Sequence, residues 1–477
     1  MQLPRPEHQG GFAATVDVEI PGSAITSLKS PSHEGSLNVV GGRTSTTRPD
    51  ERPSPSRASA TLTLRWPSLS ADFVLRVTAT GVSKPNALLQ YYPDSDGPGS
   101  IAALVTLLPE FPQEPRRTLP DIVFVVDRSA SMADRTPALR AVLVALVGNL
   151  PPGIRFNICF SDSNKPLWHR SQPLSHESSR QIMNVIDSLE VYPGHALLMP
   201  GLAAAFDLRC PRRDLEVFLL TNGGVAQLLQ QTIVTEVDKC ITDSDGATRM
   251  FVLSVGASYS TVFTNELARA GRGFSCVLSD SQDLVKTIEA IIKLALLPHI
   301  ECRLEISYAD EFEPVETCFE VELPESEMGS AATTASVDTA PLPPPETMQT
   351  PLGIPPLFPG LRSTAYLILP DVPSGLRLVG SCGGQPFEFE IRREIVEEEA
   401  GTIHALAARH EMRELEWGRG WLSAATTNNH TRLPGLWDVY PDFVRMEAAR
   451  LGKRYHVPGK WTAFVPVETG YVRCRLG

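Results

Sequence analysis

The 477-residue sequence has no uninterrupted apolar stretch of the ~18 residues that a membrane-spanning helix needs. The opening residues, MQLPRPEH, lack the apolar core of a secretory signal. Positive charge is in deficit, because 43 Lys and Arg stand against 55 Asp and Glu, a net charge of −12. This balance repels phosphate backbones and anionic lipid surfaces. We therefore predict a soluble, cytoplasmic protein that binds no nucleic acid and does not insert into membranes.

Several catalytic and cofactor motifs are also missing. None of the eight cysteines forms a C-x-x-C pair, so the sequence suggests neither a zinc cluster nor a compact disulfide framework and favours reduced thiols inside the cell. The chain has no H-E-x-x-H zinc-protease motif and no G-x-S-x-G nucleophile elbow. Neither a dinucleotide fingerprint nor a phosphate-binding loop follows its most apolar strand. We expect a protein that is not an enzyme.

What is present is a globular composition, with 42% hydrophobic and 21% charged residues, and a length that predicts about two to four domains. Four regions differ in their pattern. Residues 1–118 and 301–395 contain short stretches of alternating apolar and polar residues, the signal of half-buried strands. Residues 119–300 alternate strand-like and helical stretches, and residues 396–477 are mainly helical and end in a strand.

Two stretches interrupt the β regions, at residues 41–59 and 324–356. Both are rich in Pro, Ser and Thr and poor in aromatic residues, so they bury too little apolar area to offset the cost of ordering. We expect both to be disordered insertions. The alternating stretches that predict strands lie at 12–20, 60–64, 73–77, 303–306, 318–323, 365–369 and 387–391.

The central region has the clearest pattern. Asp121–Val126 is almost continuously apolar, as in a strand buried on both faces of a parallel sheet, and a helix follows with Thr136 as its N-cap and Pro137 in its first turn. The alternation that continues from there predicts a doubly wound α/β domain. Its other strands are expected at 156–160, 215–220, 250–255 and 274–278, and its other helices near 178–189, 198–208, 263–270 and 281–297.

The C-terminal region predicts two helices. Thr402 caps the first, in which Ile403, Leu406, Ala407 and His410 share one face, and which ends near Gly418. A second helix is expected from Pro441 to Leu451 with Gly452 at its C-cap, followed by an edge strand over Lys460–Val467.

Ligands of open α/β sheets bind at the carboxyl ends of the strands, which directs attention to the residues after the first strand. These residues are Asp127, Arg128, Ser129, Ala130 and Ser131. The pattern D-x-S-x-S places one carboxylate and two hydroxyls on a tight turn, an oxygen set that suits Mg²⁺ or Mn²⁺.

With this motif, residues 119–300 resemble a von Willebrand factor A (vWA) domain, which has a Rossmann-like fold and in which D-x-S-x-S begins the metal-ion-dependent adhesion site. The flanking regions resemble proteins that combine a VIT domain with a vWA domain, relatives of the inter-alpha-trypsin inhibitor heavy chains and the vault poly(ADP-ribose) polymerase. Residues 402–409, 418–422 and 460–468 are similar to the C-terminal part of the fungal members. The VIT domain that normally comes first is expected to be missing, with residue 12 entering just after it.

The resemblance implies the rest of the site. In the family, a threonine from a second loop and an aspartate after the fourth strand complete the metal ligands, and a partner's carboxylate fills the open position. This chain keeps Asp127, Ser129 and Ser131 but has His195 in place of the threonine and Asn222 in place of the aspartate. Because imidazole is a poor Mg²⁺ ligand and Asn222 removes a negative charge, we expect a degenerate site with weakened metal affinity.

Three functions remain open. The first is a non-enzymatic protein–protein interaction module, an adhesion-type scaffold that docks a partner, through an acidic side chain, on the vWA sheet rim, either without a cofactor or with Mg²⁺ or Mn²⁺. The second is a working Mg²⁺- or Mn²⁺-dependent protein-binding protein, to whose rim Asp162 could contribute, although a turn residue is the preferred interpretation. The third is a cryptic hydrolase with Ser129 or Ser131 as nucleophile and His195 as base.

The resemblance to the heavy chains also predicts how the β regions combine. The β segments before and after the vWA domain should form one sandwich into which that domain is inserted. Strands 12–20 and 73–77 are then expected to pair or pack with strands 303–323 and 365–391.

Overall fold

The computed structural model forms two compact units, Met1–Pro85 with Leu108–Glu110, and Asn86–Leu107 with Phe111–Gly477. The residues that it describes are 11–20, 22–30, 33, 35–64, 73, 75–81, 85–93, 99–108, 118–192, 194–256, 260–278, 284–309, 311–317, 319–321, 344–396, 401–427 and 441–464. No helix among these residues combines the length and the apolarity that a bilayer crossing requires.

The first unit is a small all-β structure. Strands β1 (Phe12–Glu19), β4 (Arg57–Leu64) and β3 (Leu37–Gly41) form an antiparallel sheet in that order, and β2 (Ala24–Lys29) pairs with β5 (Arg76–Thr80). Its core is small and is centred on the buried side chains of Leu28, Ala58 and Ala60.

The expected insertion at 41–59 is part of this unit. It is the connection between β3 and β4, and its last residues already belong to β4. The backbone N–H of Gly42 donates to the carbonyl of Arg57 (2.8 Å), and that of Ser54 donates to the carbonyl of Gly42 (2.9 Å). The connection is therefore closed by the same kind of hydrogen bond that joins the two strands, which composition alone did not reveal.

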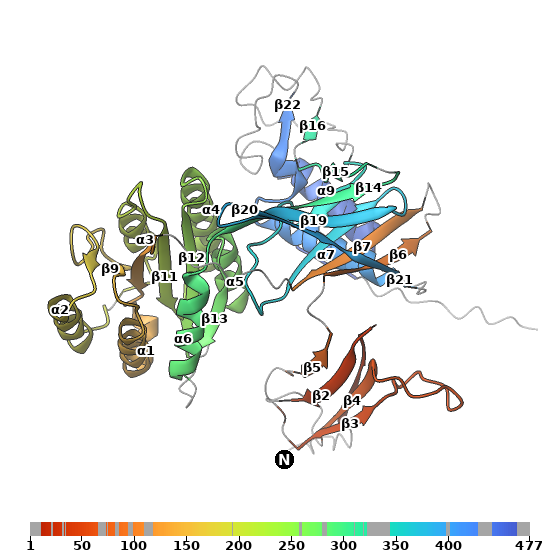
Figure 1. Ribbon diagram of the computed structural model, residues 1–477, viewed down its shortest axis with the longest axis horizontal. Helices are drawn as coiled ribbons and strands as arrows, with labels where there is room; N and C mark the ends of the chain where they lie inside the picture. Colours follow the sequence, from red (N-terminus) through yellow and green to blue (C-terminus); the bar gives the residue numbers. More distant parts are fainter. Residues whose placement is uncertain are drawn as a thin grey trace, which may run out of the picture. The chain divides into compact units, whose positions relative to one another are not determined.

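The second unit contains a β-sandwich whose strands come from the sequence before and after the α/β region (Figure 1). One sheet has the order β17-β18-β7-β6-β21 and the other the order β15-β14-β19-β20. Apolar residues of both sheets, such as Val105, Leu304 and Leu367, share one core. The strands are β6 (Asn86–Tyr92), β7 (Ser100–Leu107), β14 (Ile300–Ser307), β15 (Glu313–Pro314), β17 (Met348–Thr350), β18 (Ser363–Leu369), β19 (Gly375–Cys382), β20 (Gln385–Glu390) and β21 (Arg392–Ile395).

The expected sandwich therefore exists, but different strands join it. β7 pairs antiparallel with β18, and β6 pairs in parallel with β21, so residues 86–107 form the link. The predicted pairing was wrong for 12–20 and 73–77, because β1 and β5 pair within the first unit. Alternation of apolar and polar residues identifies a strand but carries no information about its partner.

The Pro-rich stretch 324–356 also differs from expectation in its described part. Met348–Thr350 is a fully buried strand, β17, at the edge of the five-stranded sheet. Residues 324–343 lie outside the described residues. Three buried residues within a proline-rich sequence are too few to produce a recognisable alternation of apolar and polar residues.

The central α/β domain confirms the predicted doubly wound fold. Its sheet has the order β10-β9-β8-β11-β12-β13, parallel except for β10. Its strands are β8 (Asp121–Val126), β9 (Arg155–Phe160), β10 (Gln172–Pro173), β11 (Leu215–Thr221), β12 (Thr248–Val255) and β13 (Ser275–Leu278). Its helices are α1 (Thr136–Gly148), α2 (His176–Asp187), α3 (Met199–Phe206), α4 (Gln227–Asp243), α5 (Thr261–Ala270) and α6 (Leu284–Ala295).

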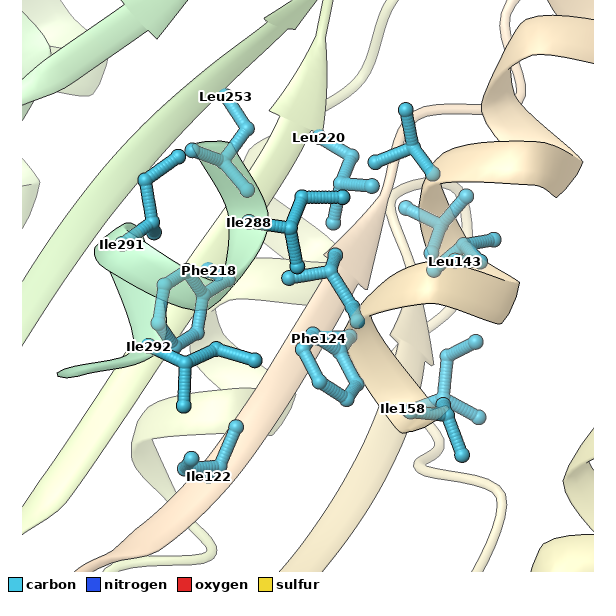
Figure 2. Close-up of a cluster of buried hydrophobic side chains, with 14 of the residues drawn as sticks. Ile122, Phe124, Leu143, Ile158, Phe218, Leu220, Leu253, Ile288, Ile291 and Ile292 are labelled. Atoms are coloured by element: carbon cyan, nitrogen blue, oxygen red, sulfur yellow. The ribbon is translucent and has the colours of Figure 1, made fainter. Parts of the chain in front are cut away.

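Alternate residues of the strands bury on opposite faces of this sheet. Phe124 and Phe218 contact the layer of α1, α2 and α6, whereas Val123, Val125 and Val217 contact the layer of α3, α4 and α5. Figure 2 shows Phe124 and Phe218 among Leu143 of α1 and Ile288, Ile291 and Ile292 of α6. Because both faces are covered, the strands are mostly apolar, which is why the sequence located them well.

Two local predictions in this domain need correction. Thr136 is the first residue of α1 rather than its N-cap, because a 3₁₀ helix, η1 (Ala130–Arg135), leads directly into it. Helix α4 was not predicted, although Ile233, Val234, Val237 and Ile241 lie on one buried face. Their spacing was a usable signal.

The C-terminal region contains α7 (Thr402–Glu416), η3 (Trp421–Ala424) and α9 (Pro441–Arg454), while β22 (Ala425–Thr427) pairs with β16 (Phe319–Val321). The buried face of α7 includes Glu411 and Glu414, whereas Leu406, expected on that face, is exposed.

Three details of this region differ from the predictions. Gly401, not Thr402, is the N-cap residue of α7. Gly452 lies inside α9 rather than at its C-cap. Residues 460–464 form no strand, only a bridge between Gly459 and Thr462, and 465–467 lie outside the described residues.

Candidate functional site

The predicted site lies at the carboxyl edge of the central sheet. β8 ends at Val126 and β11 at Thr221, and the two strands are parallel neighbours, so the residues that follow them meet at one edge. The structure brings together four of the five predicted residues, Asp127, Ser129, Ser131 and Asn222, through hydrogen bonds.

Asp127 is the buried anchor of this site. Its Oδ1 accepts a hydrogen bond from the backbone N–H of Ser129 (2.9 Å), and its Oδ2 accepts one from the hydroxyl of Thr221 (2.7 Å). Sequence reasoning missed Thr221, which is fully buried and also accepts from the N–H of Gly223 (3.1 Å). Its place as the last residue of β11 was the available signal.

Ser129, Ser131 and Asn222 form a continuous hydrogen-bonded chain. The two serine Oγ atoms are 2.9 Å apart, and Ser131 Oγ donates to Asn222 Oδ1 (3.1 Å). Asn222 Oδ1 also accepts from the N–H of Gly224 (2.9 Å), while Nδ2 donates to the carbonyl of Ser131 (2.7 Å). Because one neighbour can only donate and the other can only accept, the amide has a single orientation.

His195 does not join this network. The loop before it is close, since Gly194 O accepts from the N–H of Ala130 (3.0 Å) and the N–H of Tyr192 donates to Arg128 O (2.6 Å). The imidazole itself is exposed, and among the described residues it makes no hydrogen bond to Ser129 or Ser131. In the described part of the rim, the His195 imidazole is therefore not positioned as a base for either serine.

Asp162, two residues after the end of β9, forms an ion pair with the side chain of Arg128. Arg128 Nε and NH2 contact its two carboxylate oxygens at 3.0 and 2.7 Å, and the guanidinium lies 4.1 Å from the centroid of the Phe160 ring. A bidentate pair of this kind is geometrically specific. Asp162 thus belongs to an ion pair at the rim.

Arg135 is a second rim cation that sequence reasoning missed. Its NH1 donates to the carbonyl of Ser131 (3.1 Å), the same oxygen that accepts from Asn222 Nδ2. A Cβ atom on Gly256, just after β12, would lie 3.0 Å from Arg135 Nε. The side chain therefore extends from the β8 loop across the rim to the end of β12.

These contacts do not fit a tightly held divalent cation. Both oxygens of Asp127 accept from protein donors, and the hydroxyl of Ser131 donates to Asn222. Asn222 presents its N–H₂ group to a carbonyl, where the family's aspartate would have only acceptors. Within the described part of the chain, no three His, Cys, Asp or Glu side chains gather as a metal site.

One substitution tests whether Asp127 depends on Thr221. Thr221→Val keeps the shape but removes the hydroxyl donor from a buried carboxylate, so we expect the free energy of unfolding to fall by about 1.5–3 kcal/mol. Thr264→Val is the matched control, because buried Thr264 donates only to backbone carbonyls. Urea unfolding of both variants measures the difference, and equal losses would contradict the role given to Thr221.

Comparison with known proteins identifies the central domain. The model of the von Willebrand factor type A domain matches residues 120–277. This part of the chain is a vWA domain. Two von Willebrand factor A domain-containing proteins of Dictyostelium discoideum are 21% identical over 360 residues, covering 72% of this chain but 33% and 36% of their own lengths. The chain thus spans about a third of these relatives.

Solved structures resemble the chain more weakly. A von Willebrand factor type A protein from Catenulispora acidiphila is 14% identical, with a TM-score of 0.40, covering 79% of this chain and 88% of that one. The human COPII-coat protein Sec24c is 12% identical, with a TM-score of 0.36, covering 71% and 51%. vWA domains are generally protein-interaction modules rather than enzymes.

Proposed function

We propose that this chain is a non-enzymatic interaction protein that docks a protein partner on the carboxyl rim of its vWA sheet. In this proposal the metal-ion-dependent adhesion site is degenerate, and hydrogen bonds hold it together in place of a cation. The Asn222 amide carries the proposal, since it bridges both the hydroxyl and the carbonyl of Ser131.

The hydrogen-bond pattern supports a site that is complete without metal. Ser129, Ser131, Thr221 and Asn222 all contribute donors, and the buried carboxylate of Asp127 accepts two of them. Mg²⁺ would require these oxygens to turn their lone pairs toward the ion, and each protein hydrogen bond lost in a buried setting costs about 1–3 kcal/mol. The protein network thus competes with the metal for the same oxygens.

Calorimetric titration tests this proposal against its metal-dependent alternative. We expect no saturable heat from Mg²⁺ or Mn²⁺ with the wild-type chain or with Asp127→Ala. Saturable heat that disappears in Asp127→Ala would instead establish a working divalent-metal site.

A substitution at Asn222 gives a complementary prediction. Asn222→Asp places a second carboxylate near Asp127 and removes the donor to Ser131 O, so in EDTA we expect a loss of about 1–3 kcal/mol of stability. Mg²⁺ should restore much of the lost stability by neutralising the two neighbouring carboxylates. Asn184→Asp, on the exposed face of α2, adds the same charge elsewhere and should show neither effect. Thermal unfolding with and without Mg²⁺ measures both, and Mg²⁺-insensitive stability in Asn222→Asp would count against the proposed origin of the degeneracy.

The hydrolase alternative has no structural support at the described rim, since His195 contacts neither serine there. Serine-directed activity probes that label Ser129 or Ser131 would overturn the non-enzymatic proposal. We also propose a reducing, cytoplasmic location, because none of the eight cysteines in the sequence forms a C-x-x-C pair.

A further inference from the structure

A groove lies between the vWA domain and the C-terminal helices, within the second unit. Its volume of about 590 Å³ is in the range of ligand-binding pockets. The amino-terminal parts of α4 and α5 form one wall, and α7 with the turn at 458–460 forms the other. Gln230 Nε2 donates to the carbonyl of Val225 (3.0 Å), in the loop that joins β11 to α4. Since this loop also contains Asn222, the groove adjoins the carboxyl rim of the sheet.

Side-chain contacts hold both walls of this groove in place. Arg413 Nε on α7 lies 2.8 Å from Glu266 Oε1 on α5. Trp417, directly after α7, packs against the apolar layer between the sheet and helices α3, α4 and α5. Glu416 Oε1 accepts a hydrogen bond from the backbone N–H of Lys460 (2.9 Å), which ties the turn to α7. The groove is therefore preformed, which reduces the entropy that a ligand must lose on binding.

The lining of the groove is cationic. Arg409, Arg413 and Lys460 are its basic side chains, and Glu416 is the one carboxylate among the described lining residues. Arg413 is balanced by Glu266, but exposed Arg409 makes no ion pair or hydrogen bond with another described residue. In a chain with a net charge of −12, this is a local site of opposite sign.

Amide and apolar side chains complete the lining. Gln227 and Gln231 make no side-chain hydrogen bond within the described part of the chain. A glutamine side chain has an N–H₂ donor and a carbonyl acceptor, the same kinds of group that a peptide bond offers. Met412, Trp417 and Val262 add apolar surface. These groups together match an extended polypeptide that carries acidic and apolar side chains.

We infer that this groove binds an extended, acidic segment of a protein partner. Arg409 receives a carboxylate of the segment, while the amides of Gln227 and Gln231 bind its backbone. Apolar side chains next to the carboxylate contact Met412 and Trp417. The inference rests on the proposed docking function, because the groove adjoins the rim and gives the same partner a second contact.

The chemistry of these groups fits the two parts of the segment differently. A guanidinium is permanently charged and planar, and its N–H groups match the two oxygens of a carboxylate. Because Arg409 is exposed, water and salt screen this pair, so binding weakens as the ionic strength rises. The glutamine amides recognise backbone groups, which every peptide has. Arg409 therefore selects for the acidic residue, whereas the amides add affinity without regard to sequence.

The test begins with a random peptide display library selected on the full chain at low salt in EDTA. We expect enrichment of peptides in which an acidic residue lies next to apolar residues. An enriched peptide is then synthesised in two forms, one with the acidic residue and one with its amide counterpart. Both are titrated against wild type, Arg409→Gln, Gln231→Ala and Arg180→Gln, the last being an exposed arginine on α2.

For the acidic peptide we expect Arg409→Gln to bind about fivefold to thirtyfold more weakly and Arg180→Gln to match wild type. The amide peptide should bind wild type and Arg409→Gln equally, since a double-mutant cycle isolates this one pair. Gln231→Ala should weaken the binding of both peptides by the same factor, because its amide contacts the backbone. Thermal unfolding of each variant verifies that it is folded.

Other results overturn the inference. Selection without acidic enrichment contradicts the carboxylate, and acid-dependent binding that Arg409→Gln leaves unchanged contradicts the role of Arg409. An effect of Gln231→Ala that is confined to the acidic peptide contradicts backbone recognition.

Ala130→Tyr, at an exposed position of the rim, separates this inference from the proposed function. Peptides that lose affinity only in Ala130→Tyr dock at the rim and overturn the groove as their binding site. Peptides that lose affinity in Arg409→Gln and Gln231→Ala but not in Ala130→Tyr support the groove and count against docking on the rim.

Discussion

Replacing Arg249 with Met is expected to lower the free energy of unfolding by about 3–5 kcal/mol, because it leaves the carboxylate of Glu216 buried without its guanidinium. Both side chains are almost completely buried on the neighbouring strands β12 and β11. Arg249 Nε and NH2 lie 3.1 and 3.0 Å from the two oxygens of Glu216. NH2 also donates to the carbonyls of Ala295, the last residue of α6, and Leu297, two residues beyond it.

The matched control is the double variant Glu216→Leu with Arg249→Met. Removing both charges avoids an uncompensated buried ion, and such replacements are often neutral or stabilising. We therefore expect the double variant to recover much of the loss in urea unfolding. A double variant as unstable as Arg249→Met would show that contacts other than the ion pair carry the energy, namely the capping of α6 or the hydrogen bond between His299 Nε2 and Glu216 Oε1.

Glu411→Gln is expected to increase stability at slightly alkaline pH, on the order of 4 kcal/mol at pH 8. Burial, the carboxylate of Glu414 and more weakly that of Glu447 raise the pKa of Glu411 to about 8 from an ordinary 4.5. Between these values the folded protein binds a proton that the unfolded chain releases. Stability therefore falls as pH rises through this range, by about 1.4 kcal/mol per unit.

Glutamine keeps the acceptor for the backbone N–H of Trp421 (3.1 Å) and removes the titration. In this variant the acidic part of the stability profile depends on His404, because burial lowers the pKa of His404 to about 4 from an ordinary 6.5. Because the folded state excludes that proton, His404 makes stability fall as pH drops from 6.5 toward 4. In wild type the two residues oppose each other between about pH 4.5 and 6.5.

Denaturant unfolding of wild type and Glu411→Gln from pH 5 to 8.5 measures how the stability of each protein depends on pH. The stability of Glu411→Gln relative to wild type should increase by about 1.4 kcal/mol per pH unit from pH 5 to about pH 8 and then level off. Glu390→Gln, at an exposed glutamate of β20, should follow wild type. Parallel curves for wild type and Glu411→Gln would contradict a protonated Glu411.

Two glutamates one turn apart on α7 show why the protonation state of a buried carboxyl group cannot be predicted from the sequence. Glu414 is as buried as Glu411, yet Arg269 and Arg419 outweigh that burial and hold the pKa of Glu414 below its usual value. Arg269 belongs to α5 of the vWA domain, far away in the sequence. The contact of α7 with Arg269 of α5, together with Arg419, decides which glutamate keeps its charge.

The candidate site divides in the same way. The motif Asp127-Arg128-Ser129-Ala130-Ser131 and the position of Asn222 could be predicted, because each directly follows an apolar strand whose end must reach the sheet edge. Thr221 and Arg135 were missed, and His195 was predicted to join a network that it does not contact. Which way a side chain turns depends on neighbours from other loops.

The sequence by itself determined the doubly wound α/β core, since strands buried on both faces are mostly apolar and that pattern is local. It also determined that one carboxylate and several neutral oxygens meet at the carboxyl edge. The tertiary structure alone decided which outer strands join the sandwich, and that the amide of Asn222 and the guanidinium of Arg135 share the Ser131 carbonyl. Those outcomes depend on contacts between residues far apart in the chain, and no local pattern of residues encodes such contacts.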